Sequence, residues 1–216
     1  MTNGLSGPRK QFLDVLRVLA TCAVVLMHVL TGATDVTDAS IVPEYRSLLL
    51  SVMDLVTWCV PIFLLISGYL FLNPERTLTY PVMIKKYWRI ALAILLFGVP
   101  YAASELVVTE RTFRIRMIPE ALKMTLTGHT WSHMWYLYLI LFLYLITPLL
   151  KKVLRVLPVW GVAAVMAVIF LGSSVAPFLN KVLDVNSIPV LPDGGVYFLY
   201  YLCGYFFAVR EVCVDK

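Results

Sequence analysis

Charged residues are scarce in this sequence: Asp, Glu, Lys and Arg make up 14% of its 216 residues, whereas hydrophobic residues make up 60%. A soluble domain carries about a quarter charged residues, because water must meet a largely polar surface. The shortage of charge therefore excludes a soluble globular domain, a disordered chain and a conventional nucleic-acid binder. A mean hydropathy of +0.83 indicates that the solvent of this chain is lipid.

Cysteine is also rare, and its placement excludes the usual cysteine sites. Three of the four cysteines lie within apolar runs and the fourth follows one, without a CxxC pair or a histidine cluster nearby. They are Cys22, Cys59, Cys203 and Cys213. We interpret them as free buried thiols and expect neither a metal site nor a disulfide framework.

Long hydrophobic runs are the main feature of the sequence. A membrane-spanning helix needs about 20 residues, so the sequence predicts an all-α, polytopic helix bundle of about six spans. The apolar runs cover about 11–32, 47–72, 87–108, 134–150, 156–171 (an extension to 179 is left open) and 196–209. We expect residues 109–127 to form a short amphipathic helix on the outer membrane face. Residues 1–216 then form a single membrane domain.

Basic residues indicate the orientation in the membrane. Cytoplasmic loops carry an excess of Lys and Arg, and six spans place eleven basic residues on one side and six on the other. Both termini are therefore predicted to be cytoplasmic. Arg111, Arg114 and Arg116 are exceptions to this pattern. A cleaved signal peptide over the first apolar run is the alternative, but no small-x-small site follows His28.

The first span carries the most informative polar residues. Asp14 and Arg17 are three residues apart and can pair on a helix. Arg17 and His28 are eleven residues apart, which is three turns plus about 20°, so both lie on one face about 16 Å apart. Because a charge within a span costs roughly 2.5–3.5 kcal/mol, we expect this face to turn toward the second and third spans. Alternatively, Arg17 snorkels to the inner interface and His28 is a hydrogen-bonded packing residue.

The second and third spans offer weaker candidates. Asp54 is either a partner for a buried basic group or a solvated interfacial acid. Gly68, in the pair Ser67-Gly68, lets a neighbouring backbone approach closely. Lys85, Lys86 and Arg89 form either an interfacial basic belt or a cytoplasmic patch that binds phosphate.

The outer boundary of the fourth span contains His133 and Trp135. These residues belong either to an interfacial aromatic belt or to a binding site for a polar substrate. No third zinc ligand is near, so we expect no metal here.

Four ordered segments together resemble the acyltransferase 3 family of integral membrane proteins. The first resembles the family's opening helix, with an arginine, ten residues and a histidine. The segments are FLDVLRVLATCAVVLMHV, VPIFLLISGYLF, KKYWRIALAILLFGVP and SHMWYLYLILFLYLITPLL. The resemblance runs from the start to about Leu150, and six spans are fewer than family members usually have. The chain therefore resembles the N-terminal part of that domain.

The resemblance implies transfer of an acyl group, often acetyl, from cytoplasmic acyl-CoA to a hydroxyl of a cell-surface glycan at the plasma membrane. Acyl-CoA is then a donor substrate, and no tightly bound cofactor is expected. His28 is the implied general base, kept neutral if it is buried. Arg17 binds the thioester or phosphates of the donor, or holds the helices together through Asp14.

The remaining implied roles belong to residues nearer the two membrane surfaces. The implied phosphate-binding residues for CoA are Lys85, Lys86 and Arg89. The implied contacts with the acceptor glycan are His133 and Trp135, and Asp54 is a weaker candidate for the same role. Two other functions stay open. One is a solute path lined by Arg17, His28 and Asp54, and the other is a non-catalytic membrane subunit or truncated remnant. The chain could also assemble with a second copy of itself or with a second membrane subunit, and the sequence leaves both possibilities open.

Overall fold

The computed structural model describes residues 10–36, 43–129, 134–185, 187–192 and 194–214. All regular elements in these ranges are helices, which confirms the predicted all-α class. The chain divides into two compact units, with one boundary between two helices and the other inside a helix. Unit 1 comprises Met1–Thr77 and Val153–Lys216, and unit 2 comprises Leu78–Lys152.

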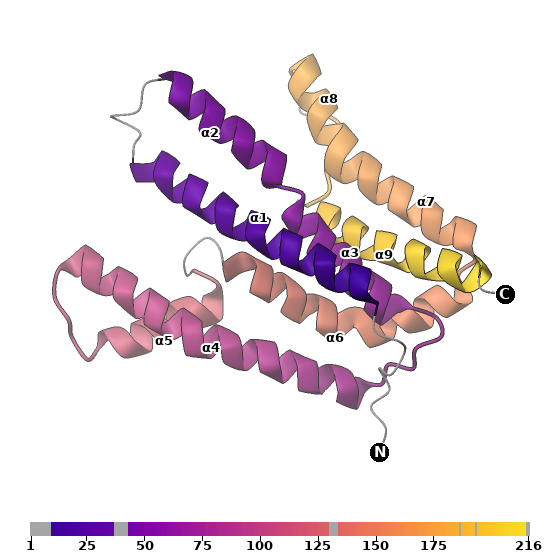
Figure 1. Cartoon of the computed structure of the whole chain (residues 1–216), viewed down its shortest axis with the longest axis horizontal. Helices are drawn as coiled ribbons and strands as arrows, with labels where there is room; N and C mark the ends of the chain where they lie inside the picture. The colour runs from indigo at the N-terminus through magenta and orange to yellow at the C-terminus, as the bar shows by residue number, and fades with distance from the viewer. Residues whose placement is uncertain (1–9, 37–42, 130–133, 186, 193, 215–216) are drawn as a thin grey trace. The chain divides into compact units, whose positions relative to one another are not determined.

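The helices are distributed unequally between the units (Figure 1). Unit 1 contains α1 (Gln11–Val36), α2 (Pro43–Val56), α3 (Cys59–Leu72), α7 (Val159–Phe170), the π-helix η2 (Leu171–Val175), α8 (Ala176–Leu183) and α9 (Gly194–Val214). Unit 2 contains α4 (Tyr80–Glu110), α5 (Met117–Thr127) and most of α6 (Trp135–Val156).

Five stretches of the described chain are long and apolar enough to cross a membrane. They are Gln11–Ala33, Tyr45–Leu72, Tyr80–Glu110, Trp135–Val156 and Val159–Leu183. Only 17% to 33% of the most apolar window of each stretch is buried against protein, so most of these side chains are left for hydrocarbon. The sixth predicted span forms α9.

The second predicted span is a pair of helices with a break at Thr57 and Trp58. Pro61 explains the break, because it has no N–H and its ring clashes with the carbonyl four residues earlier, which is that of Thr57. The hydroxyl of Thr57 donates to the carbonyl of Asp54 at 2.8 Å, and its N–H donates to the same oxygen at 3.4 Å. These bonds satisfy a carbonyl at the end of α2.

The contact between α3 and α9 is the most extensive helix pair in unit 1. A Cβ atom on Gly68 would run into the carbonyl of Tyr201, and one on Gly204 would run into the backbone of Leu65 and Tyr69. The two backbones therefore touch because both positions lack a side chain, which confirms the role predicted for Gly68.

One end of unit 1 is fixed by a small apolar cluster. Leu13 at the start of α1 packs with Ile66 and Tyr69 of α3 and with Ala208 of α9. The beginning of α1 and the final turns of α3 and α9 thus lie at the same end of this unit (Figure 1).

The burial of the cysteines differs from the expectation. Cys59 is fully buried between α1 and α2, as predicted. Cys203 is half-buried, and the expectation is wrong for Cys22, which is exposed on the outer side of α1. Its apolar surroundings in the sequence do not show which side of α1 the other helices of unit 1 cover.

Unit 2 confirms one prediction about local structure and corrects another. The short helix predicted within residues 109–127 is present as α5, which begins at Met117 and packs along α4. Thr125 is fully buried, and a Cβ on Gly98 would lie 2.7 Å from its methyl group. The basic residues predicted to precede the third span lie inside α4, which starts at Tyr80 with Pro81 in its first turn.

Replacement of Gly68 by alanine tests the close contact of α3 and α9. The new methyl group meets the backbone of Tyr201, so we expect a loss of stability of about 1–3 kcal/mol or more. Thermal unfolding in detergent measures the change. Gly32→Ala is the matched control, because a Cβ there meets nothing within 4 Å. Equal unfolding temperatures for Gly68→Ala and wild type would contradict the inferred contact.

Candidate functional site

The candidate site begins with a polar stripe on α1. The helix is unbroken from Gln11 to Val36, so Arg17, Thr21 and His28 lie along one side of it, as the spacing predicted. The side of α1 that packs in unit 1 is formed mainly by small and aliphatic residues, among them Ala20 and Ala23. At 100° per residue, the polar stripe lies roughly 90–150° around the helix from that packed side.

This placement corrects one part of the expectation that the face with Arg17 and His28 turns toward the second and third spans, because the second span does not cover that face. His28 is exposed within unit 1, and the Arg17 side chain is 41% exposed. The helices of unit 1 pack against the adjacent face of α1 and leave the polar stripe uncovered by that unit.

Arg17 and Asp14 form the ion pair that their spacing predicted. The guanidinium Nη1 of Arg17 lies 3.0 Å from Oδ1 of Asp14. Both side chains are about one third or more exposed, and such pairs contribute about 0.2–1 kcal/mol in water. The pair therefore does more to orient the guanidinium along α1 than to stabilise the fold. The hydroxyl of Thr21 donates to the Arg17 carbonyl at 2.8 Å.

The imidazole of His28 has a defined local contact. Its Nδ1 lies 2.8 Å from the backbone carbonyl of Val24, one turn earlier in α1. A carbonyl oxygen can only accept a hydrogen bond, so Nδ1 carries the proton in this contact. In the neutral ring, Nε2 is then the nitrogen with the lone pair. The helix itself thus selects the tautomer in which Nε2 can accept a proton.

Asp54 lies in unit 1 but is not joined to the polar stripe. Its side chain is exposed on α2, one turn before the break at Thr57. Among the described residues, no ion pair links Asp54 to Arg17, whose carboxylate partner is Asp14. From the sequence, Asp54 is interpreted either as a partner for a buried basic group or as a solvated interfacial acid. The structure does not support the first of these interpretations.

The basic residues of α4 form a separate group in unit 2. Lys85 and Arg89 are one turn apart and exposed, and Lys86 beside them is half-buried. The ammonium group of Lys152 lies over the ring of Tyr80, 5.8 Å from its centre. The end of α6 thus adds a cation near the start of α4. Sequence reasoning missed this, because spacing along the chain does not show which helix ends meet.

The residues predicted to meet an acceptor are only partly described. Trp135 opens α6, is 41% exposed and makes an edge-on ring contact with Tyr136 at 6.0 Å. His133 lies outside the described residues. Across the described part of the chain, no group of three or more His, Cys, Asp or Glu residues is placed to hold a metal ion.

Comparison with known families gives one match. The family model described as an acyltransferase domain, acyltransferase 3, matches residues 10–212 of this 216-residue chain. The match includes parts of both units and extends through α9, well beyond the segments that carried the resemblance. No curated protein and no solved structure matches the chain.

The tautomer of His28 can be measured directly, because the chain has only three histidines. In a variant with both His129→Gln and His133→Gln, the ¹⁵N NMR spectrum of labelled histidine reports on His28 alone. At a pH where the ring is neutral, we expect a protonated Nδ1 and an unprotonated Nε2, because Nδ1 donates to Val24. A spectrum with the proton on Nε2 would refute the assignment.

Proposed function

The chain belongs to the acyltransferase 3 family of multi-pass membrane proteins, and we propose that it transfers an acyl group from acyl-CoA to a hydroxyl group. We take the acyl group to be acetyl, the donor to be cytoplasmic, and the acceptor to be a cell-surface glycan. The observation that carries the proposal is the polar stripe on α1, with a histidine whose Nε2 can accept a proton. Family membership supplies the reaction type, and the stripe supplies groups suited to it.

In the proposed reaction, His28 is the general base. Its Nε2 takes the proton of the acceptor hydroxyl, and the oxygen forms a bond to the thioester carbonyl carbon. The carbon–sulfur bond then breaks, and the proton passes to the sulfur of CoA. The hydrogen bond from Nδ1 to Val24 supports this role, because it orients the ring and places the lone pair of the neutral ring on Nε2.

Arg17 is proposed to bind the donor. Its guanidinium is always charged and presents several donors in one plane, which suits a thioester carbonyl or a phosphate. It lies on the same stripe as His28, about 16 Å nearer the start of α1 by helical rise. The ion pair with Asp14 holds it in place, and holding that pair remains the alternative role of Arg17.

Lys85, Lys86 and Arg89 are proposed to bind the phosphates of CoA. They lie within about 100° of arc on the first turns of α4, so their charges can act together on one anion. Lys152 near Tyr80 adds a further positive charge from α6. The same residues fit an interfacial belt, so the kinetic test below is designed to separate the two roles.

The acceptor is proposed to bind at His133 and Trp135, with Asp54 as a hydrogen-bond acceptor for sugar hydroxyls. An indole face gives a sugar ring an apolar surface, and Trp135 at the start of α6 is 41% exposed. These roles rest on residue type and on position along the chain.

We further propose a plasma-membrane protein with one membrane domain, residues 1–216, and both termini in the cytoplasm. The cluster of Leu13 with Ala208 supports this, because the start of α1 and the end of α9 share one end of unit 1. Excess basic residues favour the cytoplasm for that end. Tags at both termini should then resist protease added to intact spheroplasts. Digestion of one tag alone would overturn this topology.

The central test is transfer of labelled acetyl from acetyl-CoA to cell-envelope glycans in membranes that contain the chain. We expect His28→Ala to lower the rate by about 10²–10⁴-fold, which is the usual contribution of a general base. His129→Ala is the matched control, because that exposed histidine bonds to Thr127 and has no proposed role. Equal rates for wild type and His28→Ala would remove His28 from the mechanism.

The same assay separates the other proposed functions. If wild type incorporates no label, the chain is inactive alone or uses another donor. Co-purification for a second membrane chain or a second copy then tests the subunit alternative. A solute path lined by Arg17, His28 and Asp54 predicts permeation that does not depend on acyl-CoA.

Binding of CoA phosphates predicts a change in KM rather than in kcat. Lys86→Gln or Arg89→Gln removes one exposed or half-buried charge, worth about 0.2–1 kcal/mol, so KM for acetyl-CoA should rise up to roughly fivefold. Steady-state kinetics at low ionic strength measure it. Arg114→Gln, a basic residue paired loosely with Glu110, is the control. An unchanged KM in both α4 variants would favour the interfacial belt.

A further inference from the structure

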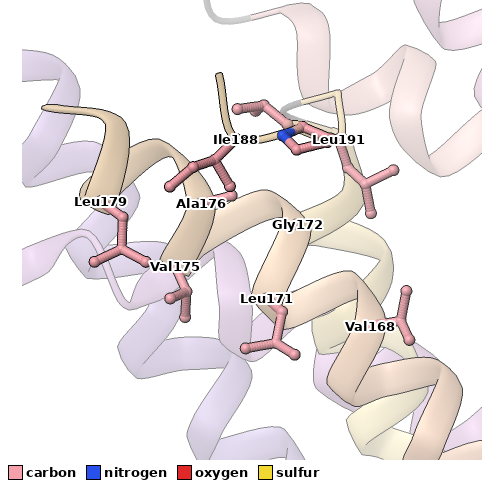
Figure 2. Close-up of a pocket in the computed structure, with 10 residues that line it drawn as sticks. Val168, Leu171, Gly172, Val175, Ala176, Leu179, Ile188 and Leu191 are labelled. Carbon is pink, nitrogen blue, oxygen red and sulfur yellow. The ribbon is translucent and has the colours of Figure 1, made fainter. Parts of the chain in front are cut away.

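An apolar groove lies beside α8 in unit 1 (Figure 2). The chain turns back after α8, and its returning segment, 187–192, runs alongside the helix that it has just left. The groove between them has a volume of about 520 Å³. Its lining is apolar throughout and includes Leu171, Val175 and Leu179 on the helix side and Ile188 and Leu191 on the returning segment.

The π-helix η2 provides one anchor for the returning segment. Here the N–H of Ala176 donates to Leu171, five residues earlier. The same step would pair the carbonyl of Gly172 with Pro177, which has no N–H. The N–H of Leu191 donates to that carbonyl instead, at 2.9 Å. A Cβ on Gly172 would lie 2.7 Å from the Leu191 side chain, so glycine permits the contact.

Asn180 provides the second anchor. Its amide nitrogen donates to the carbonyl of Ile188 at 2.9 Å, and its amide oxygen accepts from the N–H of Ile188 at 3.2 Å. Pro189 and Pro192 have no N–H to satisfy. Non-helical backbone within a membrane needs partners for its polar groups, and the anchors supply them for both backbone groups of Ile188 and for the N–H of Leu191. The two anchors hold the apolar wall of the groove in place.

The depth of the groove follows from α9. Gly195 at the start of α9 meets Ser173 of η2, while Ala208 near its end packs with Leu13. The thirteen residues from Gly195 to Ala208 rise about 20 Å, which is less than the roughly 30 Å of the hydrocarbon layer. We place Leu13 near one edge of that layer, because the basic residue Lys10 lies just before it, and the groove then lies in the opposite half. Water needs 2–4 polar partners, and the lining offers almost none.

We propose that this groove binds one acyl chain of a membrane phospholipid. The apolar side chains of the lining and the position of its helix side in a candidate membrane span, Val159–Leu183, favour a hydrocarbon chain over water. The groove is separate from the polar stripe, so this binding does not depend on the acyltransferase reaction.

Photo-labelling in nanodiscs tests the proposal. The probe is phosphatidylcholine with a diazirine in the middle of one acyl chain, mixed at increasing mole fraction with ordinary phosphatidylcholine. Labelled peptides are mapped by mass spectrometry. We expect labelling of 171–179 and 188–191 to saturate at low mole fraction. Labelling near Val25, which is 59% exposed on α1 at a similar depth, should rise in proportion to the probe.

Two variants complete the test. Val175→Trp fills the groove and should abolish the saturable labelling, whereas Val25→Trp, on the exposed side of α1, should leave it unchanged. Proportional labelling of the groove in wild type would show contact with bulk lipid only and would overturn the proposal, whether or not either variant folds. Saturable labelling that persists in folded Val175→Trp would also overturn it.

Discussion

The direct backbone contact between α3 and α9 is the constraint on which unit 1 depends. Inside a bilayer, helices gain little from leaving lipid for protein, so they associate through close packing at small residues. Gly68 and Gly204 supply that closeness, and α9 then brings Ala208 against Leu13 of α1. The rotation of α1, and with it the direction of the polar stripe, follows from a contact made by two other helices. A helix as rich in tyrosine and glycine as α9 is suited to this position, because protein rather than lipid covers much of it.

The sequence predicted the features that one helix determines alone. The all-α class, the pairing of Asp14 with Arg17 and the common side of Arg17 and His28 follow from composition and from 3.6 residues per turn. The exposure of His28 could not be predicted in this way. Helical periodicity says which residues share a side, but the neighbouring helices decide which side is covered, and both sides of α1 are rich in apolar residues.

In the candidate site, too, contacts within one helix could be predicted from the sequence, whereas contacts between helices could not. Local contacts, such as that of Nδ1 of His28 with the carbonyl of Val24, join residues one helical turn apart. Helical spacing shows that such a contact is possible, and the structure shows that it forms. Contacts that join distant segments, such as Lys152 with Tyr80, have no signature in the sequence, because an interfacial belt and a phosphate-binding patch use the same residue types. Family membership narrows the chemistry but does not assign these residues, so their roles rest on the proposed experiments.

The π-helix between α7 and α8 changes which side chains of this part of the chain correspond to those of a relative with an unbroken helix. A π turn accommodates one residue more than an α turn, so every side chain after Val175 is rotated by about 100° from where an unbroken helix would place it. A lipid-facing pattern extrapolated from α7 would therefore assign the wrong side of α8 to lipid. Within 159–183, a single register does not describe the whole span. A relative without this extra residue would present different side chains to the returning segment at equivalent aligned positions.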